Sequence, residues 1–171
     1  MDILKKNFFE LFNIDISVNV NLLDLDRKLK ELQLKFHPDK FSNTSDYEKR
    51  LATMVSSYIN DGYKVLSNIL LRVDYILKIN SYNIDESKTI NNINFLQEQI
   101  EYSELIDAMR SNPNENKINI ILNDIKKHTN NTIQEICESF EISDFDKMWN
   151  LSSKLKFYIK NTNELLSLKK I

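Results

Sequence analysis

Glycine and proline are scarce in this chain, whose 171 residues include one glycine and two prolines. Tight turns between strands need backbone positions with positive φ, which glycine usually supplies. The composition therefore argues against a sheet built from hairpins. It predicts long helices joined by short polar loops, with 42% apolar residues to form their core.

Cysteine, charge of one sign and long apolar runs are also scarce. The single cysteine, Cys137, excludes an intramolecular disulfide and a thiolate-rich metal site. A net charge of −2 argues against nucleic-acid binding. No run approaches the roughly 20 apolar residues of a membrane span, and residues 1–9 lack the features of a signal peptide. We expect a monomer in the bacterial cytoplasm that binds neither nucleic acid nor membrane; an organellar protein without its presequence is the alternative.

Hydrophobic periodicity predicts an N-terminal helical domain over residues 1–79. One amphipathic helix ends near His37, because Pro38 disfavours helical geometry at the residue before it. A second helix follows the polar residues 42–45, and a third covers 70–79. The stripe of the first helix is Leu22, Leu25, Leu29, Leu32 and Phe36, and that of the second is Leu51, Val55, Tyr58, Gly62 and Leu66.

The polar segment 80–92 predicts a linker to a C-terminal domain, residues 93–171. There we expect helices over about 95–110, 115–139 and 144–168. Three amphipathic helices with short connections predict an antiparallel three-helix bundle. The stripe predicted for the last helix is Phe145, Met148, Ser152, Leu155, Ile159, Thr162 and Leu166.

The tripeptide His37-Pro38-Asp39 lies between two helices whose stripes pair as an antiparallel hairpin. Proline with aspartate is a common turn signal, so the tripeptide alone predicts little. Its place at the tip of a helical hairpin, behind a cationic helix face, gives it more weight. The cations are Arg27, Lys28, Lys30, Lys35 and Lys40, and the alternative for each is a solvated helix face.

This arrangement resembles the J domain, and the flanking residues resemble one subfamily of it. Phe41 follows His37-Pro38-Asp39-Lys40, and residues 95–101 read Phe-Leu-Gln-Glu-Gln-Ile-Glu. The residues between them that match are Ile59, Asn60, Tyr63, Leu66, Leu70, Arg72, Tyr75 and Leu77. Over nearly its whole length the chain is identified as a member of the HscB family, the J-type co-chaperones of iron–sulfur cluster assembly.

The resemblance implies an all-α protein that is not an enzyme and holds no cofactor or metal. Such a protein stimulates ATP hydrolysis by an HscA- or DnaK-type chaperone and delivers the IscU scaffold protein to it. The resemblance assigns chaperone binding to His37, Pro38, Asp39, Lys40, Arg27, Lys28, Lys30 and Lys35.

Helix geometry points to a second surface on the bundle. Leu96 and Ile100 lie more than a quarter-turn from the predicted core residues of their helix, and Phe157 projects nearly opposite Leu155. Exposed apolar residues with a charged rim are typical of a protein-binding surface. The alternative is that these residues contact the J domain or widen the bundle core. The resemblance places client binding on Leu96, Gln97, Ile100, Glu101, Glu104 and Phe157.

Two positions of the client site depart from the family pattern, since Gln97 stands where methionine is common and Ala108 where an acidic residue is common. They predict weaker binding or a different client. A J-domain co-chaperone for another client therefore stays open, as does a helical adaptor with no ATPase partner. A small hydrolase using His37 and Asp39 would need further histidines or carboxylates converging on the loop. His128 has no such companions in the sequence, so we expect no metal there.

Overall fold

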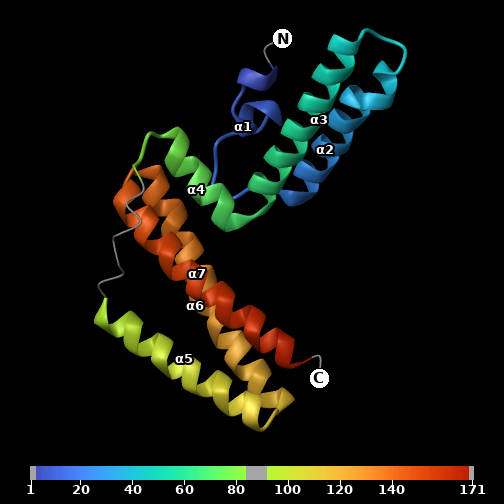
Figure 1. The fold of residues 1–171 in the computed structure, drawn as a ribbon. Coiled ribbons are helices and arrows are strands. Elements are labelled where there is room, and N and C mark those ends of the chain that lie inside the picture. The colour runs from blue at the N-terminus through green and yellow to red at the C-terminus, as the bar shows by residue number, and fades with distance from the viewer. Residues whose placement is uncertain (1–2, 84–91, 170–171) are drawn as a thin grey trace. The chain divides into compact units, whose positions relative to one another are not determined.

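The computed structural model describes residues 3–83 and 92–169, and within these ranges every regular element is a helix (Figure 1). The all-α prediction is confirmed. The chain divides into two compact units, Met1–Tyr82 and Asn83–Ile171. Most of the linker predicted over 80–92 lies outside the described residues.

The first unit is built on a helical hairpin. Its two long helices are α2 (Leu22–Phe36) and α3 (Asp46–Ser67), which pack side by side (Figure 1). The short helix α1 (Phe8–Leu11) and α4 (Ile69–Ile79) also pack on α3. Two 3-10 helices complete the unit, η1 (Ile3–Lys5) and η2 (Pro38–Phe41).

Side-chain caps fix where the hairpin helices begin. The Asn21 side chain accepts hydrogen bonds from the backbone N–H groups of Leu23 and Asp24 at the start of α2. Ser45 and Glu48 form a reciprocal capping box at the start of α3. Two hydrogen bonds from Ser45, from its side chain and its backbone, lower the pKa of the Glu48 carboxyl. The polar residues between the helices therefore define both the loop and the return helix.

The hairpin core follows the predicted stripes only in part. Leu25, Val55 and Leu66 are fully buried as predicted, and so is Ile59, which lies next to the predicted Tyr58. Tyr58 is half-buried, and Leu22, predicted on the first stripe, is 49% exposed. Leu22 is the first residue of α2, where a side chain reaches beyond the packed part of the hairpin.

The single glycine allows α1 to approach α3 closely. A Cβ atom on Gly62 would lie 2.9 Å from Cδ1 of Phe8 and 3.1 Å from Cε2 of Phe12. The Phe8 ring stacks on Tyr75 of α4, with 4.7 Å between the ring centroids. The space of the missing side chain is thus filled by the rings of Phe8 in α1 and of Phe12, the residue that ends this helix.

The second unit is an antiparallel three-helix bundle of α5 (Ile93–Ser111), α6 (Glu115–Glu141) and α7 (Phe145–Leu168) (Figure 1). α7 packs against both α5 and α6. The core of the bundle includes Phe95, Tyr102, Ile106, Met109, Ile118, Ile121, Ile125, Tyr158 and Leu165. The stripe predicted for α7 was wrong at its end, because Leu165 is buried and Leu166 is exposed.

Within the described ranges, no helix is both long and apolar enough to span a membrane.

Candidate protein-binding surfaces

The loop at the tip of the hairpin is an ordered turn, held by its own residues. His37 ends α2 in extended geometry and caps η2, with its Nδ1 atom accepting a hydrogen bond from Asp39 N at 3.3 Å. Pro38 occupies the first position of η2, where a missing N–H group costs nothing. The backbone N–H of Lys40 donates to His37 O at 3.0 Å. The turn therefore fixes the backbone at His37 and Asp39 and the His37 ring, while both side chains stay exposed.

The predicted cations around this loop divide into two groups. Arg27 is paired with Asp24 at 2.5 Å and with Glu31 at 2.7 Å on its own helix. The side-chain hydrogen bond to Arg27 is the main cause that lowers the pKa of the Asp24 carboxyl. Lys28 is mostly buried, and its Nζ atom donates to Asn13 O at 2.6 Å and lies 3.2 Å from Asp24. Both cations thus take part in contacts within the first unit.

Lys30, Lys35 and Lys40 behave differently. Each is exposed, and within the residues described none of them is paired with a carboxylate. The Nζ atom of Lys35 lies 5.4 Å from the centroid of the Phe36 ring. The positive charges of these three lysines, near the His37 loop, are therefore available to a binding partner.

An apolar residue that sequence reasoning missed lies among these cations. Leu34 is 68% exposed and lines a shallow groove with Lys30, Gln33, His37 and Lys40. At about 100° per residue, Leu34 lies on the outer side of α2, away from Leu25 and Phe36. The sequence holds the signal, because Leu34 falls outside the core stripe of its helix.

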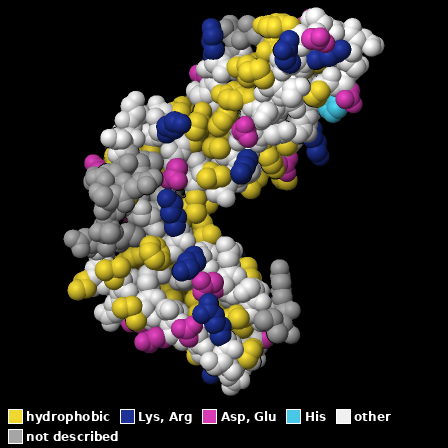
Figure 2. Space-filling model, viewed as in Figure 1, with side chains coloured by type: hydrophobic (Ala, Val, Ile, Leu, Met, Phe, Trp, Pro, Cys, Tyr) yellow, Lys and Arg dark blue, Asp and Glu magenta, His cyan; other side chains and the backbone are white. Residues whose placement is uncertain are grey.

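On the bundle, α5 presents the predicted apolar residues to solvent. Leu96 and Ile100 are 44% and 61% exposed, while Phe95 and Tyr102 of the same helix are buried. The alternative that Leu96 and Ile100 widen the bundle core therefore does not hold. Figure 2 shows hydrophobic side chains gathered over the first turns of α5, with acidic side chains farther along the helix.

Phe157 reaches this surface from α7. Its ring contacts the Phe95 ring edge-on, with 5.7 Å between the centroids, and it remains 41% exposed. The Lys154 Nζ atom lies 5.4 Å from the centroid of the same Phe95 ring. Leu96 follows Phe95 directly, so the structure brings Phe157 to the helix that carries the other predicted client residues. We refer to Leu96, Ile100 and Phe157 as the client patch, after the role that the sequence predicts for them.

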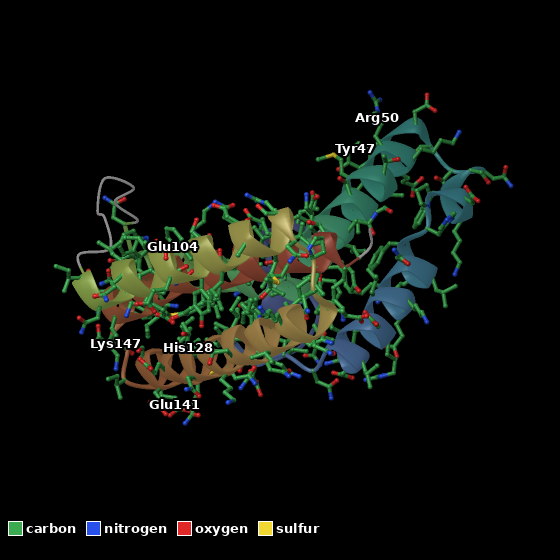
Figure 3. All side chains as sticks on the ribbon, turned by 90° about the horizontal axis from the view of Figure 1, so that it is seen from below. Tyr47, Arg50, Glu104, His128, Glu141 and Lys147 are labelled. Carbon is green, nitrogen blue, oxygen red and sulfur yellow. The ribbon has the colours of Figure 1, made fainter. Side chains whose placement is uncertain are left out.

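Carboxylates form one rim of the client patch. Glu101 and Glu104 are exposed, and no lysine or arginine among the described residues pairs with either. The amide of Gln97 donates to Glu101 at 3.4 Å. Figure 3 places Glu104 on the side of α5 that faces away from α6. Ala108 is exposed one turn farther along and adds no charge.

A polar network at the contacts between helices connects α5 to α6 and α7. Glu98 accepts a hydrogen bond from the Tyr158 hydroxyl at 3.0 Å and lies 3.2 Å from His128 Nδ1. The Tyr102 hydroxyl donates to Asp124 at 2.7 Å. Burial raises the pKa of both tyrosines, and the neighbouring carboxylates raise it further. Because Glu98 faces inward, Leu96 and Ile100 on either side of it face outward.

Sequence reasoning gave Glu98 and His128 no such part, and the contact could not be read from their spacing. Among the residues that the structure describes, no three histidine, cysteine, aspartate or glutamate side chains form a group able to hold a metal ion.

Comparison with known proteins gives relatives that match either part of the chain or nearly all of it. The family model described as the HSCB C-terminal oligomerisation domain matches residues 91–166. A co-chaperone protein HscB homolog of Colwellia psychrerythraea is 39% identical over 105 residues, which are 61% of this chain and 60% of that protein. A homolog of Shewanella woodyi is 30% identical over 159 residues, which cover 92% of this chain and 81% of that protein.

Two solved structures have the same fold. Chaperone HscB from Vibrio cholerae superposes with a TM-score of 0.87 at 24% identity, covering 96% of this chain and 98% of that one. The crystal structure of the human co-chaperone protein HscB gives a TM-score of 0.85 at 28% identity, covering 97% of this chain and 83% of that one.

Proposed function

The chain belongs to the HscB family of co-chaperones, and from this we propose that it stimulates ATP hydrolysis by an HscA/DnaK-type chaperone and delivers an IscU-type scaffold protein to it. In this role the chain performs no chemistry of its own. It acts in the bacterial cytoplasm as a bridge between the chaperone and a client on which iron–sulfur clusters are assembled.

The observation that carries the chaperone half is the ordered turn at the tip of the hairpin. His37 is exposed but held by the turn itself, so its ring loses little freedom on binding, and Asp39 is presented on a fixed backbone. Lys30, Lys35 and Lys40 are free to meet an acidic surface. Rim charges of this kind speed association and make it sensitive to salt.

The client half rests on the client patch. Its apolar side chains lose exposed surface on binding, which favours association by about 25 cal/mol per Å². Glu101 and Glu104 would pair with basic residues at the edge of the client. Gln97 offers hydrogen bonds within the same face.

A single-turnover ATPase experiment tests the proposal. We expect the native chain to accelerate hydrolysis by a cognate HscA-type chaperone, and we expect His37→Gln to abolish the acceleration. The matched control is His128→Gln, which changes the only other histidine and leaves the hairpin intact. Addition of the scaffold protein should raise the stimulated rate. A folded native chain that leaves the rate unchanged would contradict the proposal.

A further inference from the structure

The first residue of α5 is an isoleucine that the bundle does not use. Ile93 is 81% exposed and lies next to Asn92, whose side chain accepts a hydrogen bond from Phe95 N at 3.0 Å. This cap starts the helix at Ile93, so its side chain has a direction fixed by helical geometry. An isoleucine in this position adds almost nothing to the bundle core.

Helical geometry places Ile93 on the face that carries the client patch. At about 100° per residue, Ile93 is within about 20° of Ile100 and about 40° of Gln97 around the helix axis. It lies about 60° from Leu96, one turn away. The buried residues Phe95 and Tyr102 point elsewhere. The apolar surface of α5 therefore starts at its first residue.

We propose that Ile93 extends the client patch by one helical turn and contacts the client directly. This inference rests on the client half of the proposed function. Its occupant is the scaffold protein, through a surface with an apolar centre and basic residues at one edge. The carboxylates of Glu101 and Glu104, with which no lysine or arginine in the described ranges forms a salt bridge, supply the complementary charge, and they follow Ile93, Leu96 and Ile100 along the same helix.

The extension is also a means of selecting the client. Gln97 interrupts the apolar row of α5 at its middle, and Ile93 adds apolar surface one turn before that interruption. A client that fits this chain should therefore carry apolar surface opposite the start of α5. A scaffold that is polar there leaves Ile93 in water and binds less tightly.

The test measures the dissociation constant of the full-length chain with an IscU-type scaffold protein by isothermal titration calorimetry. For Ile93→Ala we expect binding about five- to tenfold weaker, since an apolar contact is lost without a change in charge. The matched control is Ile120→Ala on α6, which removes the same atoms from an isoleucine that is 68% exposed outside the client patch. The control should bind as the native chain does.

Two readouts separate this inference from the proposed function. Chaperone stimulation by Ile93→Ala should equal that of the native chain, and its thermal unfolding should be unchanged, because the side chain is exposed. If the native chain binds the scaffold and Ile93→Ala changes the dissociation constant by less than twofold, the inference is overturned and the proposed function stands. Equal weakening by Ile120→Ala would overturn it as well. A native chain with no affinity for the scaffold would remove the client half together with this inference.

Discussion

Leu34 offers a sharp test of how the hairpin binds its chaperone. It is 68% exposed and lines a groove together with His37 and Lys40. Full burial of a leucine side chain is worth about 1.5–3 kcal/mol, so covering the exposed two thirds is worth about 1–2 kcal/mol. If the chaperone covers this groove, Leu34→Ala should weaken binding about five- to thirtyfold.

The assay is the concentration of co-chaperone that gives half-maximal stimulation in single-turnover ATPase measurements. For Leu34→Ala we expect that concentration to rise by this factor while the maximal rate is kept, because the His37 turn is untouched. His37→Gln should do the reverse and reduce the maximal rate. The two variants therefore separate binding from activation.

Leu23→Ala is the control for Leu34→Ala. Leu23 is 82% exposed on the same helix, and about 16 Å of helix separates it from Leu34. The Leu23→Ala variant should leave the half-maximal concentration unchanged, and neither variant should shift the unfolding temperature. An unchanged half-maximal concentration for Leu34→Ala would refute the reasoning, because the groove would then stay open in the complex.

Two further predictions concern the fold. Gly62→Ala should lower the free energy of unfolding, measured in urea, by about 1 kcal/mol. Alanine gains about 1 kcal/mol in helix propensity, but its Cβ atom clashes with Phe8, which stacks on Tyr75, and the clash costs more. A higher free energy of unfolding would show that the Phe8 ring moves aside at little cost. Burial raises the pKa of Tyr102 and Tyr158, so their contribution to stability is complete below the ordinary tyrosine pKa and is lost as the pH rises above it. Tyrosinate absorbance from these two should appear only as helical circular dichroism disappears, and ionisation of all seven tyrosines in the folded protein would contradict this.

The helices and the turn at His37 could be predicted from local signals. Leucine spacing in α2, the cap at Ser45 and the stop at Pro38 each act within a few residues of the chain. The outward direction of Ile100 also follows from helical geometry alone. Features of this kind need no knowledge of the neighbouring helix, so sequence reasoning reaches them.

Contacts between distant residues were beyond that reasoning. In the sequence, Lys28 cannot be distinguished from an exposed lysine. In the structure its Nζ atom donates to the carbonyl oxygen of Asn13, a residue with a φ of 49°. The stripe of α7 was assigned as though the helix met one neighbour. In the bundle it meets two, and Asn161 donates to Gln99 of α5 at 2.9 Å. The second contact turns the buried face toward α5 and places Leu165 inside.

The hydrogen bond that closes the turn at His37 also favours one imidazole tautomer, although the same Nδ1 atom lies 3.5 Å from the Asp39 carboxylate. Nδ1 accepts from Asp39 N, so in the neutral ring the hydrogen resides on Nε2. The exposed edge of the ring is thus a donor, while the acceptor is already occupied by the backbone. Asparagine at this position would still close the turn but would be too short to carry a donor to the same place. One side chain therefore both closes the turn and supplies a directed N–H group. Histidine meets both requirements, whereas asparagine meets only the first.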